Sequence, residues 1–515
     1  MVTQNGATRR EERSHRTPRI GAVTLRELIA GTDVRTSRGD LDAEIAALAY
    51  DSRKVGPGTL FFCVPGEKVD GHEFAGAAVE AGAAGLVVER ELELDVTQVV
   101  VGDARVAMAP LAARFWGDPT AELRTVGVTG TNGKTTTAFL IRAALEAAGV
   151  RCGLLGTVQQ VVGGVEEEVE RTTPEAIDLQ AIFRRMLEAG DAVCAMEVSS
   201  HALELHRSDA IHFELALFTN LTQDHLDFHG DMETYFHSKR RLFEMTPGTR
   251  IVNVDDPYGR RLAADFECTT FSASGADADF VAERVSFDAA GARFDVQGTT
   301  LETRLPGDFN VANALGAFAA ARALGIEPDA AAAGLARAER VPGRFEPLDE
   351  GQEFAVLVDY AHTPDSLENA LRAARRLTAG RLIAVFGAGG DRDRDKRPKM
   401  GRAGASVADL AVVTSDNPRS EDPDAIIAEI VVGTEGAPVE VEPDRRAAIA
   451  FALRQARPGD TVVIAGKGHE QGQEFEAGRK IPFDDRAVAR EELRRLRLRQ
   501  PPAADAEGSE RDLRS

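Results

Sequence analysis

Short apolar runs alternate with longer segments in which apolar residues recur at helical spacing along most of the chain. The runs are rich in Val, Ile, Leu and Phe and include 85–88, 98–101, 126–128, 354–358, 382–386, 410–413 and 461–464. Apolar runs of this length, each followed by a helical pattern, are typical of strands that a parallel sheet buries on both faces. The pattern therefore predicts an α/β protein built from several doubly wound units.

One segment breaks this rhythm. Residues 280–304 alternate apolar and polar positions around Gly291 and Gly298. Alternation with a period of two, interrupted by glycine, predicts antiparallel hairpins rather than another parallel strand.

The chain of 515 residues is long enough for roughly three domains of about 150 residues each. Turn-forming residues mark two joints, near 120–124 after Pro119 and near 341–344 at Pro342 and Gly343. We therefore expect domains at 19–123, 124–343 and 344–498, with disordered polar tails at 1–18 and 499–515.

The charge balance narrows the possible partners. Lys and Arg number 61 against 83 Asp and Glu, a formal net charge of −22. Nucleic acids and anionic membranes attract basic fields, so neither is an expected partner, although basic residues can still gather around an anionic substrate. Four cysteines lack metal-type spacing, and neither a signal core nor an apolar run of about 20 residues is present. We expect a soluble, cytoplasmic, monomeric protein.

A phosphate-binding loop follows the apolar run at 126–128. The core of the motif is Gly-Lys-Thr at 133–135, and it opens a helix predicted over 136–148. Gly130 and Gly133 would let backbone N–H groups face a phosphate, while Lys134 would reach the β- and γ-phosphates and Thr135 would hold Mg²⁺. Val128 stands where the strict pattern has glycine, and a Gly/Thr-rich turn without a ligand is the simpler alternative. The glycine turn at 387–391 lacks the third glycine of a dinucleotide site and is a weak signal.

Acidic and histidine residues are concentrated downstream of this loop. Glu197 follows another strand-like run, where a carboxylate could complete a Mg²⁺ shell. The segment 219–230 adds two aspartates and two histidines, Asp224, His225, Asp227 and His229. A polar loop that caps the next helix would explain the same segment without a metal.

These motifs, taken in order, resemble the Mur ligases of peptidoglycan synthesis. The resemblance to the family lies in the motifs at 129–136, at 197–201, at Asn220 with 224–227, and at 308–313. A second set of motifs resembles one group within the family, the ligases that add the third residue of the stem peptide. These motifs are at 50–53, 171–174, 358–364, 389–393, 416–419 and 466–470. The motifs extend from about residue 22 to residue 490. The resemblance implies an N-terminal domain that binds a nucleotide sugar, a central P-loop ATPase domain and a Rossmann-like C-terminal domain that binds the incoming amino acid.

The resemblance also implies roles for individual residues. UDP-N-acetylmuramoyl-L-alanyl-D-glutamate would be bound by Tyr50, Ser52, the loop at 67–69, Arg171, Thr172, Thr173, Ser199, Leu205 and Arg207. ATP would be bound by Gly130, Thr131, Asn132, Gly133, Lys134, Thr135, Thr136, Asn310, Asn313, Arg344 and Asp359. The catalytic group would be Lys134, Glu197, His225 and Lys239, and the Mg²⁺ ligands would be Thr135, Glu197, His225 and a carbamate formed on Lys239 from CO₂ or bicarbonate.

The third substrate would be meso-diaminopimelate. In the family, Asp-Asn-Pro-Arg, here at 416–419, marks the ligases that take this amino acid, and lysine-adding relatives lack the arginine. Meso-diaminopimelate carries one carboxylate more than lysine, which a guanidinium can bind through two charge-assisted hydrogen bonds. The implied pocket contains Arg392, Asp416, Asn417, Pro418, Arg419, Gly466 and Glu470.

Two alternatives stay open on the sequence. A ligase resembling folylpolyglutamate synthase would share the P-loop and the amide-forming chemistry but not the motifs at 50–53 and 416–419. A P-loop switch without ligase activity would leave Glu197, His225, Lys239 and the C-terminal third of the chain unexplained.

Overall fold

The computed structural model describes residues 23–66, 69–169, 171–288 and 290–499. The predicted tails therefore lie almost wholly outside the described residues, as do Glu67 and Lys68 of the loop assigned to the UDP end. Contacts divide the chain into two compact units. The first comprises residues up to 123 together with 174–190 and 205–211, and the second comprises 124–173, 191–204 and 212 onward.

The first unit is built on a five-stranded sheet with the order β2-β7-β6-β5-β4, in which β2 is antiparallel and the other strands are parallel. The strands are β2 (Val34–Arg38), β4 (Ala47–Ala49), β5 (Thr59–Phe62), β6 (Ala83–Val88) and β7 (Thr97–Val101). Helices α3 (Ala104–Phe115) and α5 (Ala176–Ala189) contribute to the same apolar core as β5 and β7. Helix α5 thus completes a core whose other members lie more than 60 residues earlier in the chain.

A nine-stranded sheet with the order β11-β10-β9-β12-β8-β13-β14-β15-β16 organises the first part of the second unit. From β9 to β16 neighbouring strands are parallel, and β10 and β11 add an antiparallel edge. The strands are β8 (Arg124–Thr129), β9 (Cys152–Leu155), β10 (Gln160–Val162), β11 (Val165–Glu167), β12 (Val193–Glu197), β13 (Phe213–Phe218), β14 (Thr249–Asn253), β15 (Thr269–Ser272) and β16 (Phe280–Val281). Central β8 is buried along nearly its whole length, as expected for a strand covered on both faces.

The segment predicted to form hairpins, 280–304, does so from Glu283 onward, whereas Phe280–Val281 form β16, which pairs parallel with β15. Strands β17 (Glu283–Asp288), β18 (Gly291–Val296) and β19 (Thr299–Thr303) form an antiparallel sheet. Gln297 and Gly298 join β18 to β19 with positive φ angles of 49° and 81°, the geometry that a two-residue hairpin turn requires.

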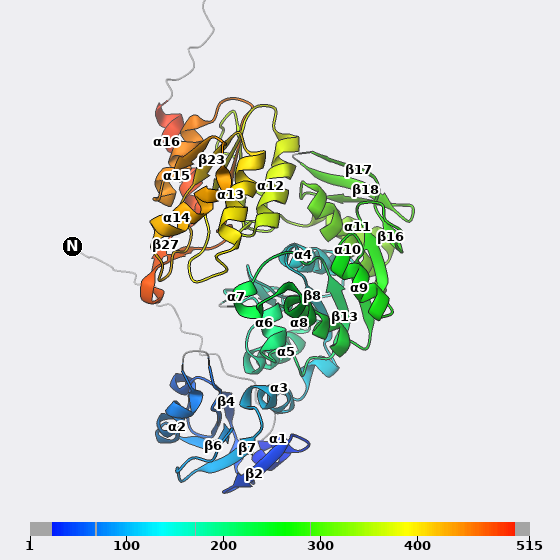
Figure 1. Ribbon diagram of the computed structural model, residues 1–515. Helices are drawn as coiled ribbons and strands as arrows, with labels where there is room; N and C mark the ends of the chain where they lie inside the picture. The colour runs from blue at the N-terminus through cyan, green and yellow to red at the C-terminus, as the bar shows by residue number, and fades with distance from the viewer. Residues whose placement is uncertain (1–22, 67–68, 170, 289, 500–515) are drawn as a thin grey trace, which may run out of the picture. The chain divides into compact units, whose positions relative to one another are not determined.

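A six-stranded sheet with the order β20-β21-β25-β22-β23-β24 organises the last part of the chain (Figure 1). All pairs except β20–β21 are parallel. The strands are β20 (Glu346–Pro347), β21 (Ala355–Asp359), β22 (Leu382–Phe386), β23 (Leu410–Val413), β24 (Val439–Val441) and β25 (Thr461–Ala465).

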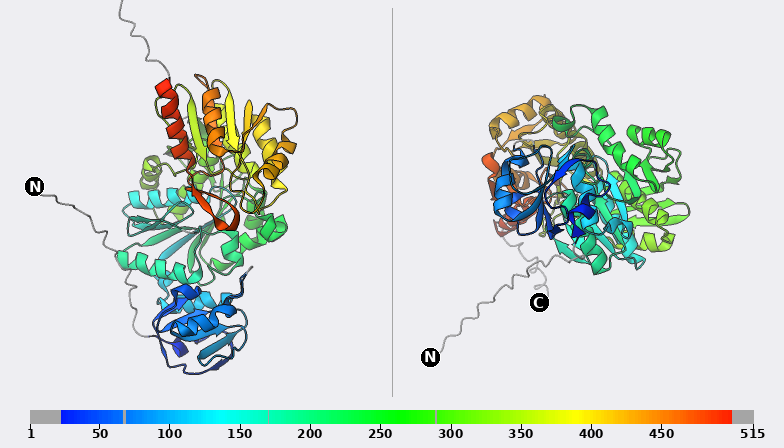
Figure 2. Two further views of the ribbon diagram at one scale, coloured as in Figure 1. Left: turned by 90° about the vertical axis from the view of Figure 1, so that its left-hand side faces the viewer. Right: turned by 90° about the horizontal axis from the view of Figure 1, so that it is seen from below.

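Helices cover both faces of this sheet. One set of alternating strand residues packs against α12 (Pro364–Leu377), α13 (Lys396–Val407) and α14 (Pro423–Val431). The other set packs against α15 (Arg445–Gln455) and α16 (Asp485–Arg499), which lie beside each other in Figure 2. The expected doubly wound, Rossmann-like layer is therefore present.

The apolar runs found in the sequence correspond to β6, β7, β8, β21, β22, β23 and β25, so the α/β prediction is confirmed. The helix after the P-loop begins at Lys134 and not at the predicted residue 136. Helix α4 spans Lys134–Ala147 because Gly133, with φ 86°, is its N-cap and the helix begins at the next residue. The domain boundaries at 123–124 and 343–344 stay predictions.

Candidate functional site

The P-loop connects β8 to α4, and its glycines are required by close contacts. Gly130 has φ 146°, and a Cβ there would lie 1.9 Å from Thr219 Oγ1. A Cβ at Gly133 would lie 2.3 Å from Asn313 Oδ1. Larger side chains would therefore push away the loop after β13 or the helix that carries Asn313.

The segment after β13 holds the P-loop in shape through hydrogen bonds. The backbone N–H of Thr131 donates to the carbonyl of Asn220 at 2.8 Å, and that of Asn132 donates to Asn220 Oδ1 at 2.9 Å. Lys134 Nζ folds back and donates to the carbonyls of Gly130 (3.0 Å) and Thr131 (2.8 Å). The ammonium group therefore lies at the loop, where it can meet a phosphate.

A cavity of about 650 Å³ opens beside this loop. The site residues predicted from the sequence that line it are Thr131, Asn132, Gly133, Lys134, Thr135, Thr136, Thr172, Glu197, Ser199, His225, Asn310, Asn313, Arg344 and Asp359. Residues more than 200 positions apart in sequence thus surround one space, and its size suits a nucleotide.

Two asparagines of α10 (Asp308–Ala323) form one wall of the cavity. Both are buried, and Asn313 Nδ2 donates to Asn310 Oδ1 at 3.0 Å while Asn310 Nδ2 donates to the Pro306 carbonyl at 2.9 Å. These bonds fix both amides in orientation, as recognition of a polar ring system requires.

Arg344 and Asp359 also line the cavity. Arg344 Nη2 donates to Thr135 Oγ1 at 3.0 Å, and its guanidinium carbon lies 4.4 Å from the centre of the Tyr360 ring. Asp359 accepts from the N–H groups of Phe345 (2.6 Å) and Ala361 (2.8 Å). Burial raises the pKa of Asp359 above its ordinary value.

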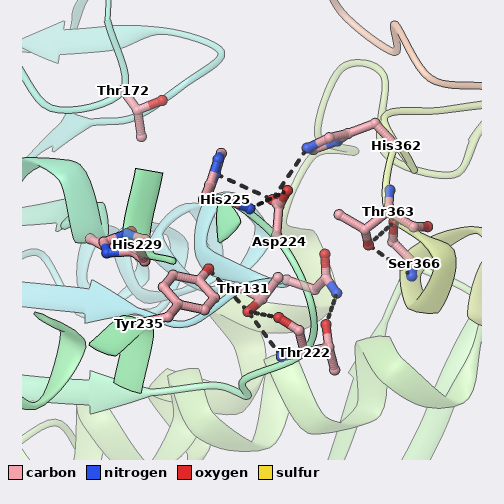
Figure 3. A network of polar contacts seen from close by, with 12 residues as sticks. Thr131, Thr172, Thr222, Asp224, His225, His229, Tyr235, His362, Thr363 and Ser366 are labelled. Atoms are coloured by element: carbon pink, nitrogen blue, oxygen red, sulfur yellow. Dashed lines mark hydrogen bonds and ion pairs between the residues drawn. The ribbon is translucent and has the colours of Figure 1, made fainter. Parts of the chain in front are cut away.

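Acidic and histidine side chains meet near the P-loop, and Figure 3 shows Asp224 between His225 and His362. Asp224 Oδ2 lies 3.2 Å from His225 Nε2 and 3.7 Å from His362 Nε2. Burial lowers the pKa of His225 to about 3, so its imidazole is neutral at pH 7 and able to act as a metal ligand. Glu197, at the end of β12, accepts from the N–H (2.6 Å) and hydroxyl (3.1 Å) of Thr157.

Lys239 lies in α8 (Met232–Met245) and is 1% exposed. Its Nζ donates to the Gly130 carbonyl at 2.7 Å and lies 4.7 Å from the centre of the Tyr235 ring. Burial and the nearby Lys134 ammonium hold the pKa of Lys239 well below its ordinary value. Lys239 is therefore an amine that can be neutral, a property unusual for lysine.

The predicted Mg²⁺ ligands have the right chemistry but do not form a complete shell by themselves. Thr135, Glu197 and His225 line the same cavity, and Lys239 contacts the P-loop behind it. Within the described stretches of the chain, no three His, Cys, Asp or Glu side chains are grouped closely enough to hold a metal ion. Mg²⁺ in nucleotide sites takes one or two protein ligands and completes its shell with phosphate oxygens and water, so the donors fit that mode of binding.

The residues assigned to the muramoyl-dipeptide fall in both units. In the second unit, Thr173 Oγ1 donates to the Glu197 carbonyl at 2.9 Å, and the N–H of Ser199 donates back to Thr173 Oγ1 at 3.2 Å. Arg171 is exposed, and Leu205 is partly exposed in a turn of the first unit.

The remaining members of this set also lie in the first unit. Tyr50 donates its hydroxyl to Asp178 at 2.8 Å, and Arg207 pairs with Glu175 at 2.9 Å. Ser52 begins a short 3₁₀ helix whose N-cap is Asp51.

The residues assigned to the amino acid form a separate cluster at the carboxyl ends of β22, β23 and β25. Asn417 Nδ2 donates to Glu470 Oε2 at 3.0 Å, and a Cβ on Gly466 would lie 2.9 Å from Asp416 Oδ2. A Cβ on Gly389 would lie 2.9 Å from Arg419 Nη1 and 3.8 Å from Arg392 Cγ, so both arginines are close to this glycine, although the exposed Arg392 donates its Nη1 to the Asp391 carbonyl at 2.9 Å. Pro418 completes the segment between Asn417 and Arg419.

The sequence did not single out Lys467, which occupies the centre of this cluster. Its Nζ is buried and donates to Asp416 Oδ1 (3.2 Å), Asn417 Oδ1 (2.7 Å) and Glu470 Oε2 (3.1 Å). The feature of the sequence that could have indicated Lys467 is its position between two glycines directly after a predicted buried strand. Tyr360 and Asp365 also line the cavity; Tyr360 lies within the motif at 358–364 and Asp365 directly follows it, but the sequence assigned neither a role.

Comparisons with known proteins cover most of the chain. The sequence profiles described as "Mur ligase family, catalytic domain", "Mur ligase middle domain" and "Mur ligase, glutamate ligase domain" match residues 44–115, 128–321 and 343–468. Two similar relatives, from Streptomyces coelicolor and Syntrophomonas wolfei, are 48% and 47% identical. The alignments cover 93% and 92% of this chain and 97% and 99% of the relatives, and both are named UDP-N-acetylmuramoyl-L-alanyl-D-glutamate--2,6-diaminopimelate ligase.

A solved structure with the same name superposes with a TM-score of 0.65 at 32% identity, covering 93% of this chain and all of that one. Fold and site together define a ligase of three α/β domains with a central P-loop domain. The chain belongs to the Mur ligase family, so the predicted resemblance is confirmed. None of the helices in the described part of the chain combines the length and apolar character needed to cross a bilayer.

Proposed function

We propose that the protein joins meso-diaminopimelate to the D-glutamyl carboxylate of UDP-N-acetylmuramoyl-L-alanyl-D-glutamate and hydrolyses ATP to ADP and phosphate in doing so. The observation that carries the proposal is that the P-loop, Glu197, His225 and Arg344 line one cavity. The names of relatives that are 47–48% identical over nearly the whole chain support the choice of substrates. Both ATP and UDP-linked sugars are available in the cytoplasm, so the proposal assigns the reaction to that compartment.

The nucleotide would bind between the P-loop and α10. Asn310 and Asn313 would face the adenine, because their amides are fixed in position on the cavity wall. Lys134 and the N-terminus of α4 would face the β- and γ-phosphates, where positive charge and backbone N–H groups are useful. Arg344 and Asp359 line the same cavity and would close on the nucleotide there.

A magnesium ion, when bound with the nucleotide, would neutralise phosphate charge and polarise the γ-phosphate. Thr135, Glu197 and His225 are the side chains that would hold it. A carbamate on Lys239 would add a fourth, carboxylate-like donor. The low pKa of Lys239 supports this modification, since only a neutral amine attacks CO₂.

The first chemical step transfers the γ-phosphoryl group to the D-glutamyl carboxylate. The carboxylate oxygen forms a bond to phosphorus, the bond to the β–γ bridging oxygen breaks, and ADP leaves. An acyl phosphate results, which an amine can attack although a free carboxylate resists attack. Catalysis would come mainly from positioning and charge neutralisation by Lys134 and the arginines.

The second step forms the amide. The amine nitrogen of meso-diaminopimelate attacks the acyl carbon, and the tetrahedral intermediate expels phosphate and loses a proton. Arg419 and Arg392 would bind the distant carboxylate of the amino acid, and Glu470 with the Gly466 region would accept its ammonium group. An arginine left without a carboxylate beside bound lysine would lower the rate with lysine.

The test is ATP-dependent phosphate release in the presence of UDP-N-acetylmuramoyl-L-alanyl-D-glutamate, Mg²⁺ and bicarbonate, with meso-diaminopimelate compared with L-lysine. We expect at least a hundredfold preference for meso-diaminopimelate in kcat/KM, equivalent to about 2.7 kcal/mol. A preference for lysine would overturn the pocket assignment while keeping the ligase. Phosphate release without any dependence on the two other substrates would favour a P-loop switch, and activity with a pterin polyglutamate substrate would favour the folylpolyglutamate-synthase alternative.

A further inference from the structure

Arg419 has a backbone conformation that is uncommon for arginine. Its φ is 51°, in the left-handed region, where a side chain with a Cβ is disfavoured. Its N–H donates to the Glu474 carbonyl at 3.1 Å, and Arg419 forms an isolated β-bridge with Phe475. Strained backbone of this kind is retained where the surroundings hold it, often at functional sites.

The guanidinium of Arg419 is held by the same neighbour. Its Nε donates to Glu474 Oε2 at 3.1 Å, and its Nη1 donates to the Gly390 carbonyl at 2.7 Å. These bonds among the described residues use Nε and one N–H of Nη1, and they fix the plane of the group. The second N–H of Nη1 and the N–H groups of Nη2 lie on the other edge, which has the geometry that binds a carboxylate in bidentate fashion.

A short hairpin supplies Glu474. Strands β26 (Gly472–Glu474) and β27 (Lys480–Pro482) pair antiparallel. Gln473 Nε2 donates to the Asp416 carbonyl at 2.7 Å, and the N–H of Glu474 donates to Asn417 Oδ1 at 2.9 Å. The hairpin therefore contacts the segment 416–419 at both ends, and its side chains and backbone set the shape of that segment.

We propose that Glu474 is a positioning residue that presets Arg419 for the second carboxylate of the incoming amino acid, and so contributes to selectivity against amino acids that lack it. The inference rests on the proposed function and adds to it a residue outside the assigned pocket. Glu474 acts through orientation: its oxygen holds Nε, and the opposite edge of the guanidinium faces the ligand. Its side chain is 32% exposed and that of Arg419 is 20% exposed, so both are accessible to a small substrate.

Two conservative variants separate orientation from charge. Glu474→Gln keeps an oxygen at the same reach and removes the charge. Glu474→Asp keeps the charge and withdraws the carboxylate by one methylene, about 1.5 Å, which breaks a 3.1 Å hydrogen bond. Glu476→Asp is the matched control, since Glu476 lies exposed on the same hairpin.

The measurement is the KM and kcat for meso-diaminopimelate and for L-lysine in the phosphate-release assay, with KM for ATP measured alongside. We expect Glu474→Asp to raise the KM for meso-diaminopimelate about tenfold (about 1.4 kcal/mol) and to reduce the preference over lysine by a similar factor. The kcat, the KM for ATP and the properties of Glu474→Gln and Glu476→Asp should stay within about threefold of the parent protein.

The opposite ranking, with Glu474→Gln impaired and Glu474→Asp normal, would overturn the inference in favour of a charge effect. Equal behaviour of the two variants, whether both normal or both impaired, would also overturn it. So would a parallel rise in the KM for ATP, which would indicate a general structural role. Failure of the proposed function is recognised separately, because the parent protein would then show no phosphate release that depends on meso-diaminopimelate.

Discussion

Lys467 and Asp416 form a buried ion pair, with 3.2 Å between Nζ and Oδ1 and side chains that are 0% and 7% exposed. Burial alone would raise the pKa of Asp416, but the charges of Lys467 and Arg445 lower it below its ordinary value. The pair joins the loop after β23 to the loop after β25, and these loops carry most of the proposed amino-acid pocket.

Replacing Lys467 by Met should therefore destabilise the fold, because it removes the ammonium that contacts the buried Asp416 carboxylate and leaves mainly the charge of Arg445 nearby. We expect a loss of about 3–5 kcal/mol in the free energy of unfolding, measured by urea denaturation. The double variant Lys467→Met/Asp416→Asn should recover part of this loss, and Lys480→Met, at an exposed site, should change little. A single variant as stable as the parent protein would show that the pair has no net role.

Lys134→Ala should abolish ATP turnover and keep the fold. The side chain contacts the Gly130 and Thr131 carbonyls at the loop surface of the cavity, and its removal takes away the positive charge facing the phosphates. We expect phosphate release to fall at least a hundredfold, with a far-UV circular dichroism spectrum like that of the parent. Lys54→Ala, at an exposed position, is the control, and turnover close to normal in Lys134→Ala would contradict the assignment of the loop.

Lys239 should carry a carbamate when CO₂ is present. Burial and the nearby Lys134 hold its pKa well below the ordinary value, which favours the neutral amine that reacts with CO₂, and the Gly130 carbonyl accepts from Nζ. With ¹³C-labelled bicarbonate, the parent protein should show a carbamate carbon signal in its NMR spectrum that Lys239→Ala lacks and Lys480→Ala keeps. Removal of CO₂ should lower ligase activity reversibly; a signal of equal size in Lys239→Ala would place the carbamate elsewhere.

Arg344→Lys should weaken ATP use although the charge is conserved. Arg344 bonds Thr135 and stacks on Tyr360 at once, which the compact ammonium of lysine cannot do. We expect kcat/KM for ATP to fall about tenfold or more. Arg340→Lys is the matched control, since Arg340 is exposed four residues away, and equal kinetics of the two variants would argue against a nucleotide role for Arg344.

His229 should make stability depend on pH. Burial lowers its pKa from 6.5 to about 4, while Nε2 is bonded to Ser200 Oγ at 2.9 Å and its ring stacks on Tyr235. The unfolded chain takes up a proton near pH 6.5 and the folded chain does not until about pH 4, so stability is fully present above pH 6.5 and is lost as the pH falls toward 4.

The expected loss attributable to His229 is about 1–2 kcal/mol between pH 6.5 and pH 5. Urea denaturation across this range should give a shallower decline for His229→Gln than for the parent. His237→Gln, at an exposed site on the same helix α8, should follow the parent curve. A decline in His229→Gln as steep as that of the parent would assign the pH dependence to other groups.

Much of the fold could be predicted from sequence because the central strands of its parallel sheets, such as β8 and β22, are buried on both faces. Such strands appear as uninterrupted apolar runs, so β22 and β23 were located with the bounds they have in the structure. The P-loop could also be predicted, because phosphate binding requires glycines where the backbone approaches the phosphate and a lysine at a fixed distance from them in the sequence.

Contacts between distant segments could not be predicted in this way. Lys467, Glu474 and Gln473 act through neighbours about 50 residues away, and no local spacing indicates such pairs. Lys239 is a similar case: its helical context is that of a solvated lysine, and its burial results from packing against the P-loop. The resemblance to a family was needed to single it out.

The interleaving of the two compact units has a consequence for the order of synthesis on the ribosome. Helix α5 and the segment 205–211 belong to the first unit but are made after β8, α4 and β9 of the second. Ala176 and Ile177 of α5 pack into the same core as α3, and Tyr50 bonds Asp178. A nascent chain that ends near residue 123 therefore lacks part of the hydrophobic core of its first unit. That unit should reach full stability only after residue 211 has left the exit tunnel, when β8, α4, β9 and β12 of the second unit have already been made and most of the second unit is still to come.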